Sequence, residues 1–283
     1  MTQSYFLLGR NVSRSPSPDM MNSAFRAAGI DAEYKALSVE PVDFDARFVE
    51  LKGTASGMNI TIPFKSEVIP MLDELDPISE KIGAVNVTKP SGGRWLGFNT
   101  DVAGIVSPLR ERFGDSGIGR ALLLGAGGAA RAFCEAMSQF GCKRVTVAIR
   151  SLEKGAAFVE QVSQTFPDLQ FDLRRIGSLG TEERGSNGGD FDLIFNATPM
   201  GSGDVPLADG MKRVVYGTEV VFDAVYRPRE TELLKLAREK GCRVIHGYEM
   251  LLGQGTAGFE KWTGVKAPVE IMNSSLLRSL EEA

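Results

Sequence analysis

Short apolar runs alternate in the first part of this chain with longer stretches in which apolar residues recur every three or four positions. The runs at 4–9 and 32–39 have the length of strands, whereas the stretches at 17–29 and 43–52 have the spacing of amphipathic helices and are closed by glycines. Regular alternation of strands and helices is typical of a parallel α/β sheet. We therefore expect the chain to begin with an α/β unit.

The stretch GMNITIPFK at 57–65 is interpreted as the next strand. Its two isoleucines alternate with Asn59 and Thr61, which predicts one apolar face and one polar face. Lys65 stands at the end of this strand, where it can share a cavity with the polar face. A surface lysine is the competing interpretation, because lysine side chains are mostly exposed in proteins.

The middle of the chain continues the alternation of strands and helices. We expect a helix near 66–72, a loop over 83–101 and a helix over 102–113. The stretch RALLLGAGGAARAFCEAMSQFG at 120–141 predicts a strand, a glycine turn and a long helix, and RVTVAIRS at 144–151 predicts the following strand. A second α/β unit follows from this order.

Two further strands and a helical tail complete the predicted fold. Apolar runs at 191–199 and 220–226 have the length of strands, and the tail has helical spacing. The sequence therefore predicts an α/β protein of two lobes. We expect a first domain over 1–101, completed by the tail at 247–283, and a second domain over 102–246.

The composition excludes several classes of protein. Of the 283 residues, 43% are hydrophobic and 24% are charged, which is typical of a globular protein, and no apolar run approaches the roughly 18 residues of a membrane helix. The first residues lack the basic segment of a signal peptide, so we expect a cytoplasmic protein with no membrane partner. A net charge of −4 without a basic stripe argues against a nucleic-acid partner.

Cysteine and histidine are scarce. The three cysteines are widely spaced and form no CxxC pair, so we expect buried free thiols and no metal site. His246 is the only histidine, and we interpret it as structural. If this chain moves protons in catalysis, a residue of another type is expected to do so.

The turn LLLGAGGAARA has the pattern of a dinucleotide-binding loop. Gly125, Gly127 and Ala130 fit G-x-G-x-x-A directly after an apolar strand and at the start of a helix. The glycines allow a tight turn and a close approach of a pyrophosphate to the backbone, and the helix N-terminus favours its negative charge. A purely structural turn between strand and helix is the competing interpretation.

The end of the next predicted strand indicates which dinucleotide binds. An NAD site has a carboxylate there, which accepts hydrogen bonds from the ribose 2′-hydroxyl. This chain instead has Arg150, Ser151 and Lys154. A carboxylate would repel a 2′-phosphate, whereas a guanidinium binds one through two hydrogen bonds. NADP is therefore favoured, with a solvated surface arginine as the alternative.

Two serines, Ser15 and Ser17, lie at the start of the first predicted helix. Their hydroxyls and the free backbone N–H groups of a helix N-terminus suit a carboxylate ligand. Plain helix capping is the alternative.

Nine segments, in order and over nearly the whole chain, resemble the shikimate dehydrogenase family. They are GRNVSRSPSPDMMN, GMNITIPFK, GAVNV, GFNTD, LGAGGAARA, AIRS, NATPMG, DAVYRP and GYEMLLGQGTAGFEKWTG. The resemblance implies a substrate-binding domain followed by a Rossmann NADP-binding domain, with the C-terminal helices packing back on the first lobe. It also implies reversible, NADPH-dependent reduction of 3-dehydroshikimate to shikimate, a step in aromatic amino-acid biosynthesis.

The resemblance further implies roles for individual residues. It implies that Lys65 and Asp101 are the catalytic pair. The residues that it implies for substrate binding are Ser15, Ser17, Asn59, Thr61, Asn86, Tyr226 and Gln254. The residues that it implies for cofactor binding are Gly125, Ala126, Gly127, Gly128, Ala129, Arg150, Ser151, Lys154, Ala224 and Gly247.

Some positions depart from the usual pattern of the family. They are Arg14 and Met21 where histidines are frequent, Val87 where threonine is usual, Ile149 where asparagine is usual, and Ala224 where methionine is common. None of these departures removes a proton donor or a ligand of the substrate carboxylate. Ile149 puts the contacts with the adenosine in doubt, and Ala224 is expected to loosen the packing around the nicotinamide.

The implied chemistry is consistent with a lysine. Reducing a ketone requires a hydride at carbon and a proton at oxygen. An ammonium is a far stronger acid than an alcohol, so Lys65 can supply this proton while Asp101 orients it and hydrogen-bonds a substrate hydroxyl. In the oxidation direction the amine must first lose its proton, which predicts faster oxidation at alkaline pH.

Two alternatives remain at this point. One is a quinate/shikimate dehydrogenase that uses NAD or both cofactors, although the serines and Arg150 favour shikimate and NADP. The other is a non-catalytic protein that senses NADP or a metabolite, although such a protein should have lost Lys65 or Asp101. We expect small molecules as the ligands, and a monomer or a homodimer.

Overall fold

The computed structural model describes the chain except for a few short segments, and the chain forms two compact units. The described residues are 2–114, 117–179, 191–202 and 205–282. We call Met1–Gly104 together with Leu252–Ala283 the first unit, and Ile105–Leu251 the second unit. None of the helices in the described residues is long and apolar enough to cross a membrane.

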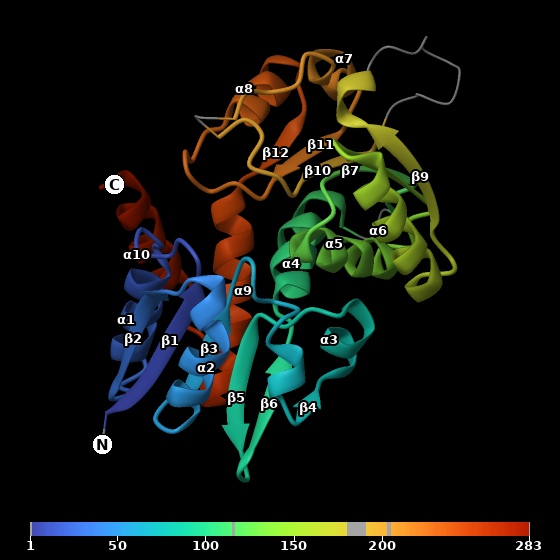
Figure 1. The fold of residues 1–283 in the computed structure, drawn as a ribbon. Helices are drawn as coiled ribbons and strands as arrows, with labels where there is room; N and C mark the ends of the chain where they lie inside the picture. The colour runs from blue at the N-terminus through green and yellow to red at the C-terminus, as the bar shows by residue number, and fades with distance from the viewer. Residues whose placement is uncertain (1, 115–116, 180–190, 203–204, 283) are drawn as a thin grey trace. The chain divides into compact units, whose positions relative to one another are not determined.

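The first unit is built on a mixed six-stranded sheet with the order β2-β1-β3-β5-β6-β4 (Figure 1). Its strands are β1 (Gln3–Gly9), β2 (Ala32–Ser38), β3 (Gly57–Ile60), β4 (Glu74–Leu75), β5 (Val87–Ser91) and β6 (Arg94–Phe98). Its helices are α1 (Ser17–Ala27), α2 (Phe44–Lys52), α3 (Pro77–Ile82) and α10 (Val269–Glu281). Strands β1, β2 and β3 are parallel, as expected, whereas β5 runs antiparallel to both β3 and β6.

The predicted strand at 57–65 is wrong beyond Ile60. Residues 61–64 form a turn, in which the N–H of Phe64 donates to the carbonyl of Thr61 at 2.9 Å. Pro63 has no N–H with which to continue a strand ladder. The expected apolar face therefore breaks down, since Ile60 is 1% exposed and Ile62 is 75% exposed.

Two other predicted elements of the first unit are also wrong. The expected helix near 66–72 is only a turn followed by a short 3-10 helix at Ile69–Met71. The expected loop over 83–101 contains the hairpin of β5 and β6, which turns at Gly92 and Gly93, both with positive φ. Two glycines between alternating apolar runs are a hairpin signal, because this turn requires positive φ.

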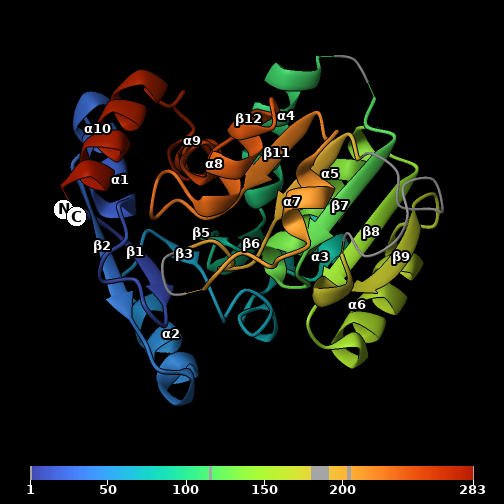
Figure 2. The same ribbon diagram turned by 90° about the horizontal axis from the view of Figure 1, so that it is seen from above.

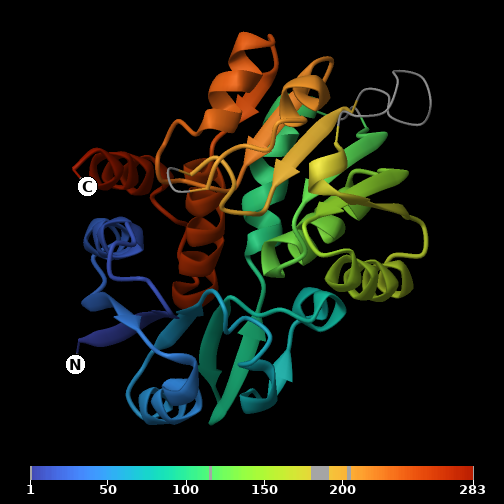
Figure 3. The ribbon, with the colours of Figure 1, turned by 45° about the horizontal axis from the view of Figure 1, so that its top comes forward.

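Aromatic side chains fill both faces of the first sheet. On one face Tyr5 stacks on Phe25 of α1 and lies against Trp262 of α9 (Gly247–Thr263). On the other face Phe44 of α2 stacks on Phe64 with ring centroids 4.0 Å apart. The C-terminal helix α10 packs on α1, as Figure 3 shows, and the expected return of the tail to the first lobe is confirmed.

The second unit is a parallel six-stranded sheet with the order β12-β11-β10-β7-β8-β9 (Figure 2). Its strands are β7 (Arg120–Leu124), β8 (Arg144–Ile149), β9 (Gln170–Arg175), β10 (Leu193–Asn196), β11 (Val220–Asp223) and β12 (Arg243–Ile245). Its helices are α5 (Gly128–Gln139), α6 (Leu152–Thr165), α7 (Met211–Val215) and α8 (Glu232–Glu239). The strand order reverses between β7 and β10, which is where such sheets bind ligands at their carboxyl edge.

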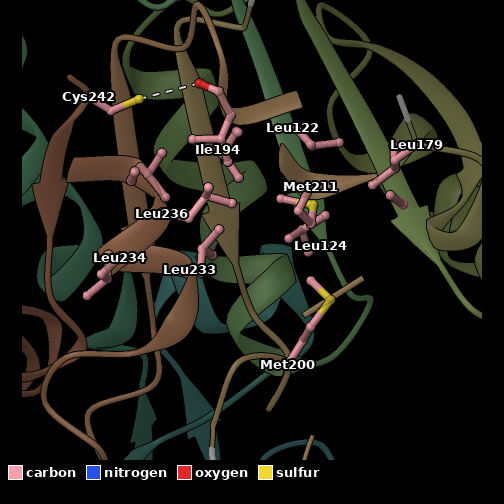
Figure 4. Close-up of a cluster of buried hydrophobic side chains, with 14 residues drawn as sticks. Leu122, Leu124, Leu179, Ile194, Met200, Met211, Leu233, Leu234, Leu236 and Cys242 are labelled. Atoms are coloured by element: carbon pink, nitrogen blue, oxygen red, sulfur yellow. Dashed lines mark hydrogen bonds between the residues drawn. The ribbon is translucent and has the colours of Figure 1, made fainter. Parts of the chain in front are cut away.

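Two apolar layers enclose the second sheet. On one face, Leu122 and Leu124 of β7 lie in one cluster with Leu233 and Leu236 of α8 (Figure 4). On the opposite face, α5 packs against the sheet through stacked phenylalanine rings. The expected Rossmann-type α/β architecture is confirmed. Helices α4 (Asp101–Phe113) and α9 each begin in one unit and end in the other.

We expect Gly57→Ala to destabilise the first unit. A Cβ at Gly57 would lie 2.4 Å from Nε1 of Trp262, whose N–H donates to the carbonyl of Thr88 at 3.0 Å. Overpacking of this kind costs about 1–3 kcal/mol of unfolding free energy. Gly53→Ala is the control, because the nearest atom to its added Cβ is 3.5 Å away.

Urea unfolding followed by tryptophan fluorescence measures the stability of the first unit. Both tryptophans, Trp95 and Trp262, belong to the first unit. Equal midpoints for Gly57→Ala and Gly53→Ala would contradict the prediction.

Candidate functional site

Lys65 and Asp101 form an ion pair in the first unit. Lys65 Nζ donates to Asp101 Oδ2 at 2.5 Å, and the two side chains are 15% and 5% exposed. Lys65 lies in the turn after β3, and Asp101 is the first residue of α4, where the helix dipole favours a carboxylate. The Coulomb attraction is stronger here than at a solvated surface, because little water screens the pair.

Asn86 connects this pair to the rest of the first unit. Its Nδ2 lies 3.0 Å from Asp101 Oδ1, 3.0 Å from Thr100 Oγ1 and 3.4 Å from Gln254 Oε1. Its Oδ1 accepts from the N–H of Thr100 at 2.7 Å. Asn86 therefore holds the loop before α4 in place, and it joins Asp101 to Gln254 of α9.

Asn59 is held by a tyrosine that the sequence did not indicate. The hydroxyl of Tyr34 in β2 donates to Asn59 Oδ1 at 2.7 Å, and Asn59 Nδ2 donates to the carbonyl of Asn86 at 2.9 Å. Burial raises the pKa of Tyr34 well above its ordinary value, so the phenol stays a proton donor. The link between Tyr34 and Asn59 joins residues 25 positions apart, and no local pattern predicts it.

Ser15, Ser17 and Thr61 lie at the same edge of the first sheet. The serines follow β1 and Thr61 follows β3, and these parallel strands are neighbours. Ser15 Oγ donates to Ser17 Oγ at 3.1 Å, and Pro16 precedes α1 without a side-chain cap. The N–H of Ser17, the first residue of α1, donates to Ser15 Oγ at 3.3 Å, so Ser15 satisfies one backbone donor at the start of this helix.

The glycine turn after β7 has the geometry that the sequence predicts. Gly125 has a φ of +105°, and a Cβ there would lie 2.8 Å from Thr198 Cγ2. A Cβ at Gly127 would meet nothing within 4 Å, so an open space borders this part of the turn. Ala126 lies within the turn, Gly128 and Ala129 are the first two residues of α5, and Ala130 is fully buried.

Arg150, Ser151 and Lys154 lie at the carboxyl end of β8. Ser151 is the N-cap of α6, and its hydroxyl accepts from the N–H of Lys154 at 3.4 Å. Within the described ranges, neither cationic side chain has a carboxylate partner. A dinucleotide with an additional phosphate fits these features. The open space at Gly127 and a helix N-terminus suit its phosphates, and the two cations suit the additional negative charge.

Ala224 and Gly247 lie close together in the second unit. A Cβ at Gly247 would lie 2.6 Å from the carbonyl oxygen of Ala224 and 2.4 Å from that of Val225, so a larger residue does not fit. Tyr226 follows in the same loop and is partly exposed. The neighbouring His246 is held by Glu249, which accepts from its backbone N–H at 2.9 Å.

A buried carboxyl group supports the loop that contains Ala224. Asp223 Oδ1 accepts from Asn196 Nδ2 and from the N–H of Val225, each at 3.0 Å, and Asp223 Oδ2 accepts from the hydroxyl of Thr231 at 2.6 Å. Burial raises the pKa of Asp223 to about 6, against the effect of these hydrogen bonds. Sequence reasoning missed this residue because its partners come from separate elements.

The predicted site residues thus form two groups. Hydrogen bonds link Lys65, Asp101, Asn86, Gln254 and Asn59 directly, and Ser15, Ser17 and Thr61 lie at the same sheet edge. The second unit holds the glycine turn, the cations after β8, and the loop with Ala224 and Tyr226. Among the residues that the structure describes, no cluster of metal-binding side chains is found.

Family models match three parts of the chain. The model described as the shikimate dehydrogenase substrate binding domain matches residues 7–88, and the shikimate/quinate 5-dehydrogenase model matches residues 109–175. The model of the shikimate 5′-dehydrogenase C-terminal domain matches residues 247–277. These matches fall in both units.

Relatives of known identity match nearly the whole chain. A shikimate dehydrogenase (NADP(+)) from Moorella thermoacetica is 37% identical over 97% of this chain and 92% of its own length. A crystal structure of a shikimate dehydrogenase in complex with NADP+ matches with a TM-score of 0.87 and 31% identity, covering 99% of this chain and 96% of that one. A quinate dehydrogenase from Corynebacterium glutamicum in complex with NAD matches with a TM-score of 0.86 and 26% identity, covering 98% and 99%.

We expect Asp223→Asn to change how stability depends on pH. The pKa of Asp223 is raised from 3.8 to about 6, so between these values the folded chain holds the proton more tightly than the unfolded chain. The contribution of this carboxyl to stability is therefore present at about pH 4 and is lost as the pH rises through about 6. Asparagine has no proton to lose and keeps the shape of the side chain.

Unfolding free energies of both proteins between about pH 4 and pH 7 measure this difference. The stability of Asp223→Asn relative to the wild type should rise across that range by up to about 3 kcal/mol. A difference that does not vary with pH would show that Asp223 titrates alike in the folded and unfolded chains.

Proposed function

This chain belongs to the shikimate dehydrogenase family, and we infer that it reduces 3-dehydroshikimate to shikimate reversibly with NADPH. It is thus an NADP-dependent oxidoreductase that acts on a CH–OH group in aromatic amino-acid biosynthesis. The observation that carries the catalytic assignment is the partly buried pair of Lys65 and Asp101, which Asn86 connects to Gln254. A binding protein without chemistry has no need of a buried ammonium at such a site, since burying charge costs free energy.

Lys65 is the proton donor in this proposal. Bound NADPH supplies the hydride that the ketone carbon receives. As the ketone oxygen gains negative charge, Lys65 Nζ donates a proton to it, and in the reverse direction the neutral amine accepts the proton of the hydroxyl. Asp101 Oδ2 holds the ammonium at 2.5 Å and accepts a hydrogen bond from a neighbouring substrate hydroxyl.

The remaining polar residues of the first unit bind the substrate. Ser15 and Ser17 donate their hydroxyl hydrogens to the substrate carboxylate, and the N-terminus of α1 supports this negative charge. The residues that bind substrate hydroxyls are Asn59, Thr61, Asn86 and Gln254. Tyr34 acts through Asn59, because its hydroxyl occupies Asn59 Oδ1 and so fixes which amide atoms remain for the substrate.

The second unit binds the cofactor, and we assign its Tyr226 to substrate binding. The pyrophosphate is bound at the turn Gly125, Ala126, Gly127, Gly128 and Ala129, where α5 begins. Arg150, Ser151 and Lys154 bind the 2′-phosphate, and Ala224 and Gly247 border the nicotinamide. The first unit is therefore the substrate-binding domain, and the second unit is the NADP-binding domain.

The proposed function also implies a location and an oligomeric state for the enzyme. We propose that the enzyme lies in the cytoplasm and that its ligands are small molecules. We also propose that it is a monomer or a homodimer. The net charge of −4 supports the proposal that the enzyme does not bind nucleic acid, since the phosphate backbone attracts positive charge.

We expect Lys65→Ala to lower kcat by about a thousandfold, because a positioned general acid contributes roughly 10²–10⁴ to the rate. The KM for shikimate should change much less, since the substrate carboxylate and most hydroxyls are bound elsewhere. Asp101→Ala is expected to behave in the same way. Lys35→Ala is the control, because Lys35 lies in β2 with 56% of its side chain exposed.

Steady-state oxidation of shikimate, followed by the absorbance of NADPH, measures these effects. Circular dichroism of each variant checks that the chain is folded. An unchanged kcat in Lys65→Ala or Asp101→Ala would remove that residue from the mechanism.

We expect shikimate with NADP to be the preferred pair among four combinations of substrate and cofactor. The structural likeness to a quinate dehydrogenase in complex with NAD makes quinate and NAD the relevant competitors. NADP should win because Arg150 and Lys154 have no carboxylate partner in the described residues and a carboxylate is lacking at the end of β8. Values of kcat/KM for shikimate and quinate, each with NADP and with NAD, test this, and a preference for quinate with NAD would reverse the assignment.

A further inference from the structure

The carboxyl edge of the second sheet carries a further cation beside the residues assigned to the 2′-phosphate. Arg175 is the last residue of β9 and pairs in register with Ile149, the last residue of β8. Arg150 follows Ile149 directly. Neighbouring strands lie about 4.8 Å apart, so the backbones of Arg150 and Arg175 end side by side.

Arg175 lies on the face of the sheet that α6 covers. A Cβ at Gly155 in α6 would lie 2.6 Å from Ile149 Cγ2 and 2.6 Å from Leu173 Cδ1, so both of these side chains face α6. Arg175 comes two residues after Leu173 in β9 and therefore shares its face. Figure 2 shows α6 alongside β8 and β9. The first turn of α6, which contains Lys154, begins at the same edge.

Within residues 2–114, 117–179, 191–202 and 205–282, carboxylates do not neutralise the charges at this edge. In the part of the chain that the structure describes, no carboxylate pairs with Arg150, Lys154 or Arg175. Glu153, in the first turn of α6, is exposed and makes no ion pair with them. The arginine at the opposite end of β8 differs, since Arg144 lies 3.7 Å from Asp172 and also bonds to Gln170.

We propose that Arg175 is a second guanidinium for the 2′-phosphate of NADP and so a determinant of cofactor specificity. This inference rests on the NADP site proposed above. A phosphate monoester carries close to two negative charges and three acceptor oxygens, and one guanidinium occupies two of those oxygens at most. Arg150 and Arg175, at the ends of two neighbouring strands, together offer two guanidinium groups to this phosphate. Ile149, which pairs with Arg175 and precedes Arg150, has no hydrogen-bonding atom in its side chain.

The inference predicts a selective effect of Arg175→Gln, which removes the charge and keeps most of the side-chain length. The KM for NADP should rise about 5- to 20-fold, as expected for the loss of one charge-assisted contact with a phosphate. The kcat with saturating NADP, the KM for shikimate and the kcat/KM with NAD should stay unchanged, because NAD has a hydroxyl at this position. Arg144→Gln, on β8 at the far end, is the matched control and should leave the ratio of NADP to NAD use unchanged.

Binding of adenosine 2′,5′-bisphosphate and of adenosine 5′-monophosphate, measured by calorimetry, tests the contact without turnover. The wild type should prefer the bisphosphate, and Arg175→Gln should reduce this preference about 5- to 20-fold while Arg144→Gln retains it. An unchanged preference in Arg175→Gln, or an equal loss for both ligands, would overturn the role of Arg175.

The two assays separate this inference from the proposed function. If the wild type fails to oxidise shikimate but Arg175→Gln still loses its preference for the bisphosphate, the substrate assignment is wrong and the role of Arg175 stands. If the wild type does not distinguish the bisphosphate from the monophosphate, the 2′-phosphate site and the role of Arg175 are both overturned.

Discussion

The ion pair between the partly buried Lys65 and the buried Asp101 is the interaction on which the first unit depends. Removing one partner of such a pair leaves an unpaired charge away from water, which costs about 3–5 kcal/mol. The structure therefore holds both partners tightly, since Asn86 bonds to Asp101 and also to the loop that begins α4. The same contacts that stabilise the charge also orient the ammonium, so the proposed proton transfer and the stability of the first unit depend on the same residues.

Charge has a comparable part in the cofactor site that we propose for the second unit. The glycine turn after β7 suits any dinucleotide, because pyrophosphate binding uses backbone N–H groups at the start of α5. We propose that discrimination between NADP and NAD arises at the next two strand ends, where Arg150 follows β8 and Arg175 ends β9. The buried Asp223 supports the loop after β11, because it accepts hydrogen bonds from Asn196 of β10, from Val225 in this loop and from Thr231 before α8.

Much of the fold and the site was predictable because the signals are local. Alternating strands and helices, the glycine turn and the helical tail each depend on residues close together in the chain. The failures were local misreadings with physical causes: Pro63 ends the strand that was extended to Lys65, and the Gly92–Gly93 turn closes a hairpin in a predicted loop. Neither failure moved Lys65 away from Asp101, because strand β3 still delivers its carboxyl end to the same sheet edge.

The sequence by itself determined the α/β class, the order of most of the elements, the family and the residue types at the site. These follow from periodicity and from short motifs whose chemistry is carried by neighbouring positions. Only the tertiary structure decided which distant residues meet: Tyr34 with Asn59, Asp223 with Thr231, and Arg175 with the end of β8. Contacts of this kind depend on strand order and register. They join residues that are far apart in the chain, so no local pattern indicates them.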